Sequence, residues 1–448
     1  MEKKTPIILI IVGITGDLAS RKLLPAISEI LKASALPEDF QILGVTRQSN
    51  VDVDKLLKNI EDKDSIKKYL TIFQMDTDKE DEYSRLEEKL KEIENKFKNK
   101  AEYLFYLSVP PQASESIIQS LGVSGLSKKE QTKLLLEKPF GVDLASATTL
   151  IKEIDKYFNK DQVYRIDHYL AKEMAQNIVV FREGNSLFKH TWNKDFIECI
   201  EILASEDIGI EGRSSFYEQT GALRDVLQSH LLQLTAIILM DIGNLENTRD
   251  IPSRRLKALK SLSIPSDKPL RDYVSRGQYR NYKEEVDNPK SNVETYVSIT
   301  LESDDSRWTG VPITLTAGKM LDKKTTEIRI FYKKDNNRDS NELILRLQPN
   351  EGIALYLWSK RPGYEKEFEK HMLHFNYGEY YNKLPEAYEQ VLLDASRSDH
   401  NLFTSSEEVI ESWRIVEGVQ EAWEKGSDDL FIYEGGVSPA DIEKEKNK

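Results

Sequence analysis

Residues 7 to 31 read IILIIVGITGDLASRKLLPAISEIL. The stretch begins with residues 7–12, which are all Ile, Leu or Val, and such a short branched run is typical of a buried strand. Gly13 and Gly16 follow the strand, and apolar residues then recur at helical spacing as far as Leu31. A strand, a glycine turn and a helix in this order predict the first βαβ unit of a parallel sheet.

Strand-like and helical patterns alternate up to about Asp167 and then change. We expect strands at residues 7–12, 41–46, 103–109 and 133–137 and helices at 18–31, 52–60, 82–97 and 143–158. Beyond Asp167 we expect strands at residues 196–204, 293–301, 313–317, 326–332 and 341–348, helices at 225–240 and 405–424, and an irregular segment at 252–292. The patterns predict two domains, α/β followed by α+β. Residues 1–168 form a Rossmann domain with a doubly wound parallel sheet, and residues 169–448 form a domain with a large, mainly antiparallel sheet flanked by helices.

The composition excludes several classes of protein. With 448 residues, of which 39% are hydrophobic and 31% charged, the chain is long enough for two domains with real cores. The formal net charge of −13 argues against a nucleic-acid or membrane-surface partner. A single cysteine, Cys199, excludes a disulfide framework and a cysteine-rich metal site. The apolar run at residues 7–12 is too short for a signal peptide or a membrane span, so we expect a cytoplasmic protein.

The glycine turn is the first candidate binding site. Gly13-Ile14-Thr15-Gly16-Asp17-Leu18 has the pattern G-x-x-G rather than the full G-x-G-x-x-G, and a turn without a ligand explains it equally well. The next predicted strand ends at Arg47, where an NAD site usually has an acidic residue for the ribose hydroxyls. Arg47, together with Thr15 and Gln48, suits a 2′-phosphate, although a solvated arginine is the alternative. The sequence therefore favours NADP as coenzyme, with NAD as the alternative.

Two further segments place polar side chains where a core does not need them. Residues 136–141 read LEKPFG, and Lys138 follows a predicted strand, either as a ligand residue or as a solvated turn lysine. Residues 165–173 read RIDHYLAKE. This segment gathers a carboxylate, an imidazole, a phenol and an ammonium group, which can hold a phosphate and contact the rest of a substrate.

His230 lies in the segment GALRDVLQSHLLQL, residues 221–234, on a strongly apolar helix that we expect Asp225 to cap. A lone histidine on such a helix is more often structural than catalytic. A general base needs a partner that orients it, and Asp167 is the candidate. His371 and His374 have no clear further ligands in the sequence, and we expect no metal site.

The chain resembles the glucose-6-phosphate dehydrogenase family from about Ile7 to Asp441. The resemblance rests on seven segments in the family's order: GITGDLASRKLLPA, LLLEKPFG, RIDHYLAKE, GALRDVLQSH, VPITLTAGKML, RLQPNEG and LPEAYEQVLLDA. It implies oxidation of β-D-glucose 6-phosphate at C1 to 6-phospho-D-glucono-1,5-lactone with hydride transfer to NADP, the first step of the oxidative pentose phosphate pathway. It also implies a homodimer or homotetramer formed through the large sheet.

The resemblance assigns roles to residues. His230 matches the general base and Asp167 the carboxylate that orients it, while His168, Tyr169 and Lys172 match the ligands of the 6-phosphate. The other substrate-binding positions match Lys138, Glu206, Asp225, Lys319 and Lys324. The positions that line the coenzyme match Gly13, Thr15, Gly16, Asp17, Leu18, Arg47 and Lys138.

Three positions depart from the family pattern. Ala171 stands where the signature has glycine, and it fits only if that position does not need a positive φ. Lys324 replaces a common arginine and loses its two-pronged geometry, and Ser229 replaces a common asparagine. Two alternatives stay open: an enzyme for another hexose, and a ligand-binding relative without activity. The second would be expected to lose His230 or Asp167, and both are present.

Overall fold

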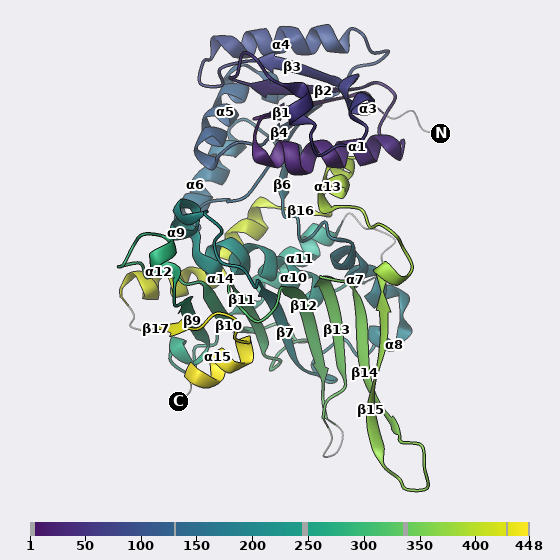
Figure 1. The fold of residues 1–448 in the computed structure, drawn as a ribbon, viewed down its shortest axis with the longest axis vertical. Coiled ribbons are helices and arrows are strands. Elements are labelled where there is room, and N and C mark those ends of the chain that lie inside the picture. Colours follow the sequence, from purple (N-terminus) through teal and green to yellow (C-terminus); the bar gives the residue numbers. More distant parts are fainter. Residues whose placement is uncertain (1–4, 130, 244–249, 335–338, 427–428, 447–448) are drawn as a thin grey trace. The chain divides into compact units, whose positions relative to one another are not determined.

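The computed structural model describes residues 5–129, 131–243, 250–334, 339–426 and 429–446. Internal packing divides the chain into two units, shown in Figure 1. Unit 1 contains Met1–Ala171 and Pro385–Ser406, and unit 2 contains Lys172–Leu384 and Glu407–Lys448. The sequence patterns predict one boundary, after residue 168, and give no sign that residues 385–406 return to unit 1.

Unit 1 is built on a seven-stranded sheet in the order β16-β6-β5-β4-β1-β2-β3. Its strands are β1 (Ile7–Val12), β2 (Phe40–Thr46), β3 (Leu70–Gln74), β4 (Glu102–Leu107), β5 (Thr132–Leu136), β6 (Val163–Ile166) and β16 (Phe403–Thr404). Neighbouring strands are parallel except β16, which is antiparallel to β6. Strands β2 and β3 lie to one side of β1, and β4, β5 and β6 lie to the other, which confirms the doubly wound arrangement.

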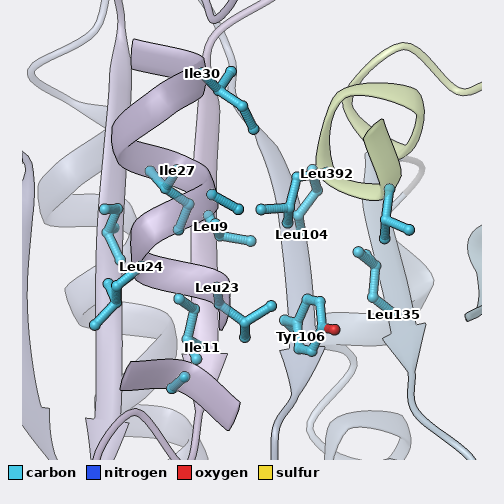
Figure 2. Close-up of a cluster of buried hydrophobic side chains, with 14 of the residues drawn as sticks. Leu9, Ile11, Leu23, Leu24, Ile27, Ile30, Leu104, Tyr106, Leu135 and Leu392 are labelled. Carbon is cyan, nitrogen blue, oxygen red and sulfur yellow. The ribbon is translucent and has the colours of Figure 1, made fainter. Parts of the chain in front are cut away.

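Helices cover both faces of this sheet. One face packs against α1 (Leu24–Lys32), α3 (Lys63–Lys67) and α13 (Ala387–Ser396), and the other against α4 (Asp81–Glu94), α5 (Pro111–Val123) and α6 (Leu144–Asp155). Alternate residues of β1 enter the two cores, and Figure 2 shows Leu9 and Ile11 in the core that also contains Leu392 of α13. Burial on both faces explains why β1 is continuously apolar, since each such side chain contributes about 1.5–3 kcal/mol.

Unit 2 contains a ten-stranded sheet in the order β15-β14-β13-β12-β7-β11-β10-β9-β17, with β8 paired to β10. Its strands are β7 (Ile197–Ser205), β8 (Leu262–Ser263), β9 (Val274–Tyr279), β10 (Tyr296–Ser303), β11 (Ile313–Gly318), β12 (Thr325–Tyr332), β13 (Glu342–Gln348), β14 (Gly352–Lys360), β15 (Phe368–Asn376) and β17 (Leu430–Tyr433). Only two neighbouring pairs, β7 with β11 and β9 with β17, are parallel among the strands described. The expected, mainly antiparallel sheet is confirmed.

The helices of unit 2 include a π-helical segment, η4 (Leu223–Leu231), that continues into α10 (Leu232–Leu239). The other helices are α7 (Glu173–Gly184), α8 (Ser186–Lys189), α9 (Ser214–Ala222), α11 (Ile251–Lys260), α12 (Tyr282–Glu285), α14 (Ser406–Glu424) and α15 (Pro439–Lys446). Segment η4 packs on β7, β10 and β11, so the sheet supports it directly.

Some local predictions are wrong. The helix expected at residues 52–60 is the short α2 (Val53–Leu56), capped by Asp52 and ended by a turn at Leu57. The segment expected to be irregular, residues 252–292, contains α11, β9 and α12. Strand β9 was hidden because it contains buried polar residues whose partners lie far away in sequence: Arg276 pairs with Asp429 at 2.6 Å.

Among the residues that the structure describes, no helix has the length and apolar character needed to cross a bilayer.

Candidate active site

Four of the predicted segments follow parallel strands of unit 1. Gly13 follows β1, Arg47 follows β2, Glu137 follows β5 and Asp167 follows β6. Because these strands run in the same direction, their carboxyl ends lie at one edge of the sheet. In doubly wound sheets that edge is where ligands bind.

The turn after β1 requires glycine at its first position. Gly13 has a φ of +86°, and a Cβ atom there would collide with the carbonyl oxygen of Ser108. The Gly13 N–H donates to the carbonyl of Val45 at 3.0 Å, and the Gly16 N–H donates to the carbonyl of Gly13 at 2.9 Å. The turn leads into a short π-helical segment, η1 (Ala19–Leu23), and then α1. A tight glycine turn between a strand and a helix is a suitable place for the phosphates of a dinucleotide.

Thr46, at the end of β2, brings the next group of predicted residues together. Its hydroxyl lies 3.2 Å from that of Thr15 and accepts the N–H of Gln48 at 3.3 Å. Arg47, between them, is exposed. Asp17 forms an exposed ion pair with Arg21 at 2.8 Å, which contributes little to stability.

Asp167 makes hydrogen bonds within the segment RIDHYLAKE, residues 165–173. It is buried, its Oδ1 accepts the N–H of Tyr169 at 2.9 Å, and its carbonyl accepts the N–H of Leu170 at 3.1 Å. The rings of His168 and Tyr169 lie 5.0 Å apart, edge to face. Ala171 has no positive φ and packs in the core of unit 1, so alanine fits in place of the family glycine.

Glu137, in the segment LEKPFG, is a half-buried carboxylate that no sequence pattern singled out. The hydroxyl of Tyr106, on β4, donates a hydrogen bond to it. Burial raises the pKa of Glu137, while the hydrogen bond from Tyr106 opposes the shift. Glu137 therefore anchors the end of β5 beside Lys138, whose peptide bond with Pro139 is cis.

Lys172, which belongs to unit 2, is oriented by an amide. Its Nζ donates to Oε1 of Gln348 at 2.7 Å, and Nε2 of Gln348 donates to the hydroxyl of Thr326 at 3.0 Å. The N–H of Met174, in the first turn of α7, donates to the carboxylate of Glu351 at 3.0 Å. Both Gln348 and Glu351 lie in the segment RLQPNEG, but only the fold reveals their contacts.

Lys319 and Glu206 form a second polar cluster in unit 2. The buried ammonium of Lys319 pairs with the carboxylate of Glu206 and lies 5.4 Å from the ring centroid of Tyr217. Burial raises the pKa of the Tyr217 phenol well above its usual value, so this ring stays neutral. Lys324, by contrast, lies exposed just before β12.

Segment η4 carries Asp225 and His230. His230 is only 4% exposed, as the apolar helix predicted. The expectation that Asp225 caps this helix is wrong, because η4 begins at Leu223 and places Asp225 inside its first turn. The carbonyl of Asp225 accepts the hydroxyl of Ser229 at 3.1 Å.

The predicted residues thus divide between the two units. The coenzyme positions, Lys138 and the stretch Asp167 to Tyr169 belong to unit 1, and Lys172, Glu206, Asp225, His230, Lys319 and Lys324 belong to unit 2. Each unit therefore contains some of the site residues predicted from the sequence.

Both parts of the chain match models of one family. Residues 179–445 match "Glucose-6-phosphate dehydrogenase, C-terminal domain" and residues 10–177 match "Glucose-6-phosphate dehydrogenase, NAD binding domain". Glucose-6-phosphate 1-dehydrogenase of Chlamydia muridarum is 37% identical over 94% of this chain and 91% of its own. The enzyme of the same name from Bacillus subtilis is 34% identical over 96% of this chain and 97% of its own.

Solved structures of the family have the same fold. A glucose-6-phosphate dehydrogenase in complex with its substrate glucose-6-phosphate has a TM-score of 0.92 at 29% identity, covering 100% of this chain and 98% of that one. Glucose-6-phosphate 1-dehydrogenase from Mycobacterium avium has a TM-score of 0.81 at 30% identity, covering 96% and 95%. The resemblance inferred from the seven segments is confirmed, and the chain belongs to the glucose-6-phosphate dehydrogenase family.

Proposed function

We propose that this protein is a cytoplasmic glucose-6-phosphate 1-dehydrogenase. It oxidises β-D-glucose 6-phosphate at C1 to 6-phospho-D-glucono-1,5-lactone, the first step of the oxidative pentose phosphate pathway. The observation that carries the proposal is family membership across nearly the whole chain, with His230, Asp167 and the RIDHYLAKE segment all retained. A homodimer or homotetramer is the expected assembly, which light scattering after size exclusion would test.

The proton step is assigned to His230. A buried neutral imidazole is a good proton acceptor near pH 7, and it takes the proton of the C1 hydroxyl. Asp167 is proposed as the carboxylate that orients this ring and stabilises the imidazolium that forms. The support for the pairing is the family resemblance of both segments.

The remaining substrate roles follow the chemistry of each group. His168, Tyr169 and Lys172 hold the 6-phosphate through directed hydrogen bonds and a positive charge. The sugar hydroxyls and the rest of the substrate are assigned to Lys138, Glu206, Asp225, Lys319 and Lys324. The Lys319–Glu206 pair supports this, since the buried ammonium and the partly exposed carboxylate offer a donor and an acceptor to neighbouring hydroxyls.

The coenzyme is assigned to the edge of unit 1. Gly13, Thr15, Gly16, Asp17, Leu18, Arg47, Gln48 and Lys138 would hold it, and a bound nicotinamide supplies the acceptor for the hydride from C1. The strict requirement for glycine at position 13 supports the assignment, since the positive φ and the close approach of Ser108 keep the turn after β1 tight. The exposed Arg47 favours NADP over NAD.

Replacing Arg47 by Ala tests the coenzyme preference. We expect KM for NADP to rise at least about 10-fold and KM for NAD to change little, because a charged hydrogen bond contributes about 1.5–3 kcal/mol. Steady-state assays that follow the absorbance of the reduced coenzyme measure both constants. Arg85→Ala, an exposed arginine on α4, is the matched control. Equal changes for the two coenzymes would remove Arg47 from the adenosine site.

Replacing His230 by Asn tests the base. We expect kcat to fall about 10²–10⁴-fold while KM for glucose 6-phosphate stays nearly the same, since the ring acts on the proton rather than on binding. The same assay should be run with glucose 6-phosphate, glucose and galactose 6-phosphate. Unchanged turnover would exclude His230 as the base, and a preference for another sugar would favour the related-hexose alternative.

A further inference from the structure

Segment η4 begins at an unusual junction. Gly221, the residue before the last of α9, has φ 63° and ψ −179°, which breaks the helical path, and the chain re-enters a helix at Leu223. Asp225 and His230 lie five positions apart on this helix. A π-helical turn is frequent at functional sites, and here one such segment carries both side chains.

Glu294, in the segment before β10, holds this junction. Its Oε1 accepts the N–H of Leu223 at 2.9 Å, and its carbonyl accepts the N–H of Ala222 at 3.0 Å. A Cβ atom on Gly221 would overlap both the Oε1 and the Oε2 of Glu294, so no other residue leaves room for the carboxyl group. Two consecutive N–H groups at the start of η4 are therefore fixed by one residue of another segment.

We propose that Glu294 is a positioning residue for the dehydrogenase reaction: its carboxyl group fixes the start of η4, and with it His230 and Asp225, in a way that depends on whether the group carries a proton. The inference rests on the proposed function in assigning His230 as the base. No part of Glu294 needs to touch the substrate for it to act in this way.

Several groups around Glu294 act on the pKa of its carboxyl group. Burial raises its pKa to about 7, while the N–H groups of Leu223 and of Glu294 itself and the charges of Arg224 and Arg276 favour the ionised form. Tyr217 and Tyr282 also face the carboxyl group, and each phenol has a raised pKa and stays neutral. Above pH 7 the carboxylate makes a charge-assisted bond to the helix start, and below pH 7 that bond weakens.

The first test is independent of catalysis. Between pH 4.5 and about 7 the folded protein keeps the Glu294 proton while the unfolded chain loses it, so stability falls as pH rises through this window. Glu294→Gln has no proton to lose. Its unfolding equilibrium constant, from urea denaturation, should become smaller relative to the wild type by about 10²-fold across the window. Parallel curves for the two proteins would overturn the titration of Glu294.

The second test reads the orientation of His230. With histidine labelled by ¹⁵N, the imidazole resonance absent from His230→Asn is that of His230. We expect the chemical shift of this resonance to change between pH 6.5 and pH 8 more in the wild type than in Glu294→Gln. The difference between the two proteins is the part of the change that Glu294 causes. An identical response in both proteins would overturn the positioning role, even in a protein without dehydrogenase activity.

The third test measures the steady-state kinetics of Glu294 variants. Glu294→Ala leaves the Leu223 N–H without its acceptor, and we expect kcat to fall about 10-fold with KM for the coenzyme changed less than twofold. Glu294→Gln keeps a neutral acceptor oxygen, so its kcat should exceed that of Glu294→Ala, match that of the wild type below pH 7 and lack the wild-type rise above pH 7. Glu218→Gln is the control, since that carboxylate accepts from Tyr282, Asn288 and Ser291 rather than from η4. Full activity in Glu294→Ala, or the same loss in Glu218→Gln, would overturn the proposal, while failure of His230→Asn to lower kcat would instead overturn the assigned base.

Discussion

The Lys172 side chain is oriented by a hydrogen bond to a neutral group. Its ammonium donates to the neutral amide of Gln348, and that amide is itself held by Thr326. A neutral partner fixes the direction of the ammonium group, and it does not cancel the positive charge as a carboxylate would. An anionic ligand would therefore meet a cation already turned to a defined position.

Replacing Lys172 by Ala should weaken the binding of glucose 6-phosphate specifically. A charged hydrogen bond contributes about 1.5–3 kcal/mol, so we expect KM for glucose 6-phosphate to rise about 10–100-fold while the constants for free glucose stay nearly the same. Lys189→Ala, an exposed lysine on α8, provides the control. If glucose and glucose 6-phosphate are affected equally, Lys172 is not a ligand of the phosphate.

Sequence patterns predicted most residues of the candidate site but not the residues that hold them in place through hydrogen bonds. Gly13 and Arg47 could be identified because each follows a recognisable strand, and His230 because it lies on a recognisable helix. Asp167 could be identified from the polar segment RIDHYLAKE. The partners that hold the site, such as Gln348 for Lys172, could not be identified. The distance of 176 positions between those two residues is bridged only by the fold.

At the scale of elements, the strand–turn–helix unit at β1 depends on the backbone of one residue. Gly13 combines a positive φ with a collision between any Cβ and the Ser108 carbonyl. Among the described residues assigned to the coenzyme, Gly13 combines a positive φ with a collision at the Cβ position, whereas Gly16 has no positive φ. A substitution at Gly13 is therefore expected to change the backbone of the turn.

Gly13→Ala should lower both stability and coenzyme affinity. The left-handed conformation alone costs alanine about 1–2 kcal/mol, and the collision adds to this, so we expect a loss above about 2 kcal/mol and a KM for NADP raised at least about 10-fold. Thermal denaturation with and without NADP separates the two effects. Gly184→Ala, with open space around it at the end of α7, should be neutral or slightly stabilising. A Gly13→Ala protein with wild-type affinity would remove the turn from the coenzyme site.

The helix at residues 223–239 illustrates what periodicity predicts and what it misses. Its apolar residues predicted a buried helix and a buried His230, and both are confirmed. Nothing in its pattern predicts that the first part is π-helical or that Glu294 replaces Asp225 at its start. A start held by a residue 71 positions away lies beyond any local signal.

At the scale of the whole chain, unit 2 is joined internally by a buried ion pair. Arg255 of α11 and Glu408 of α14 are separated by 153 positions, and their side chains are 1% and 0% exposed with a distance of 2.8 Å between Nε and Oε1. Removing one partner takes away the opposite charge that faces the other buried group, which is the costly case for an ion pair.

Glu408→Ala should therefore destabilise unit 2 by about 3–5 kcal/mol. The double replacement Arg255→Met with Glu408→Leu should recover most of this, since it removes both charges and keeps apolar volume. Lys425→Ala breaks an exposed pair with Glu421 and should cost less than about 1 kcal/mol. Denaturation in urea measures all three. Equal stability of Glu408→Ala and Lys425→Ala would contradict this account of the buried pair.

The return of residues 385–406 to unit 1 has a consequence for how the protein is made. Leu392 and Phe403 belong to the same core as Leu9, and β16 forms the edge of a sheet whose first strand begins at residue 7. During synthesis on the ribosome, the first 171 residues leave the exit tunnel with one face of their sheet incompletely covered. That face is completed only after more than two hundred further residues have been translated, so we expect the nascent N-terminal part to expose apolar surface that favours association until then.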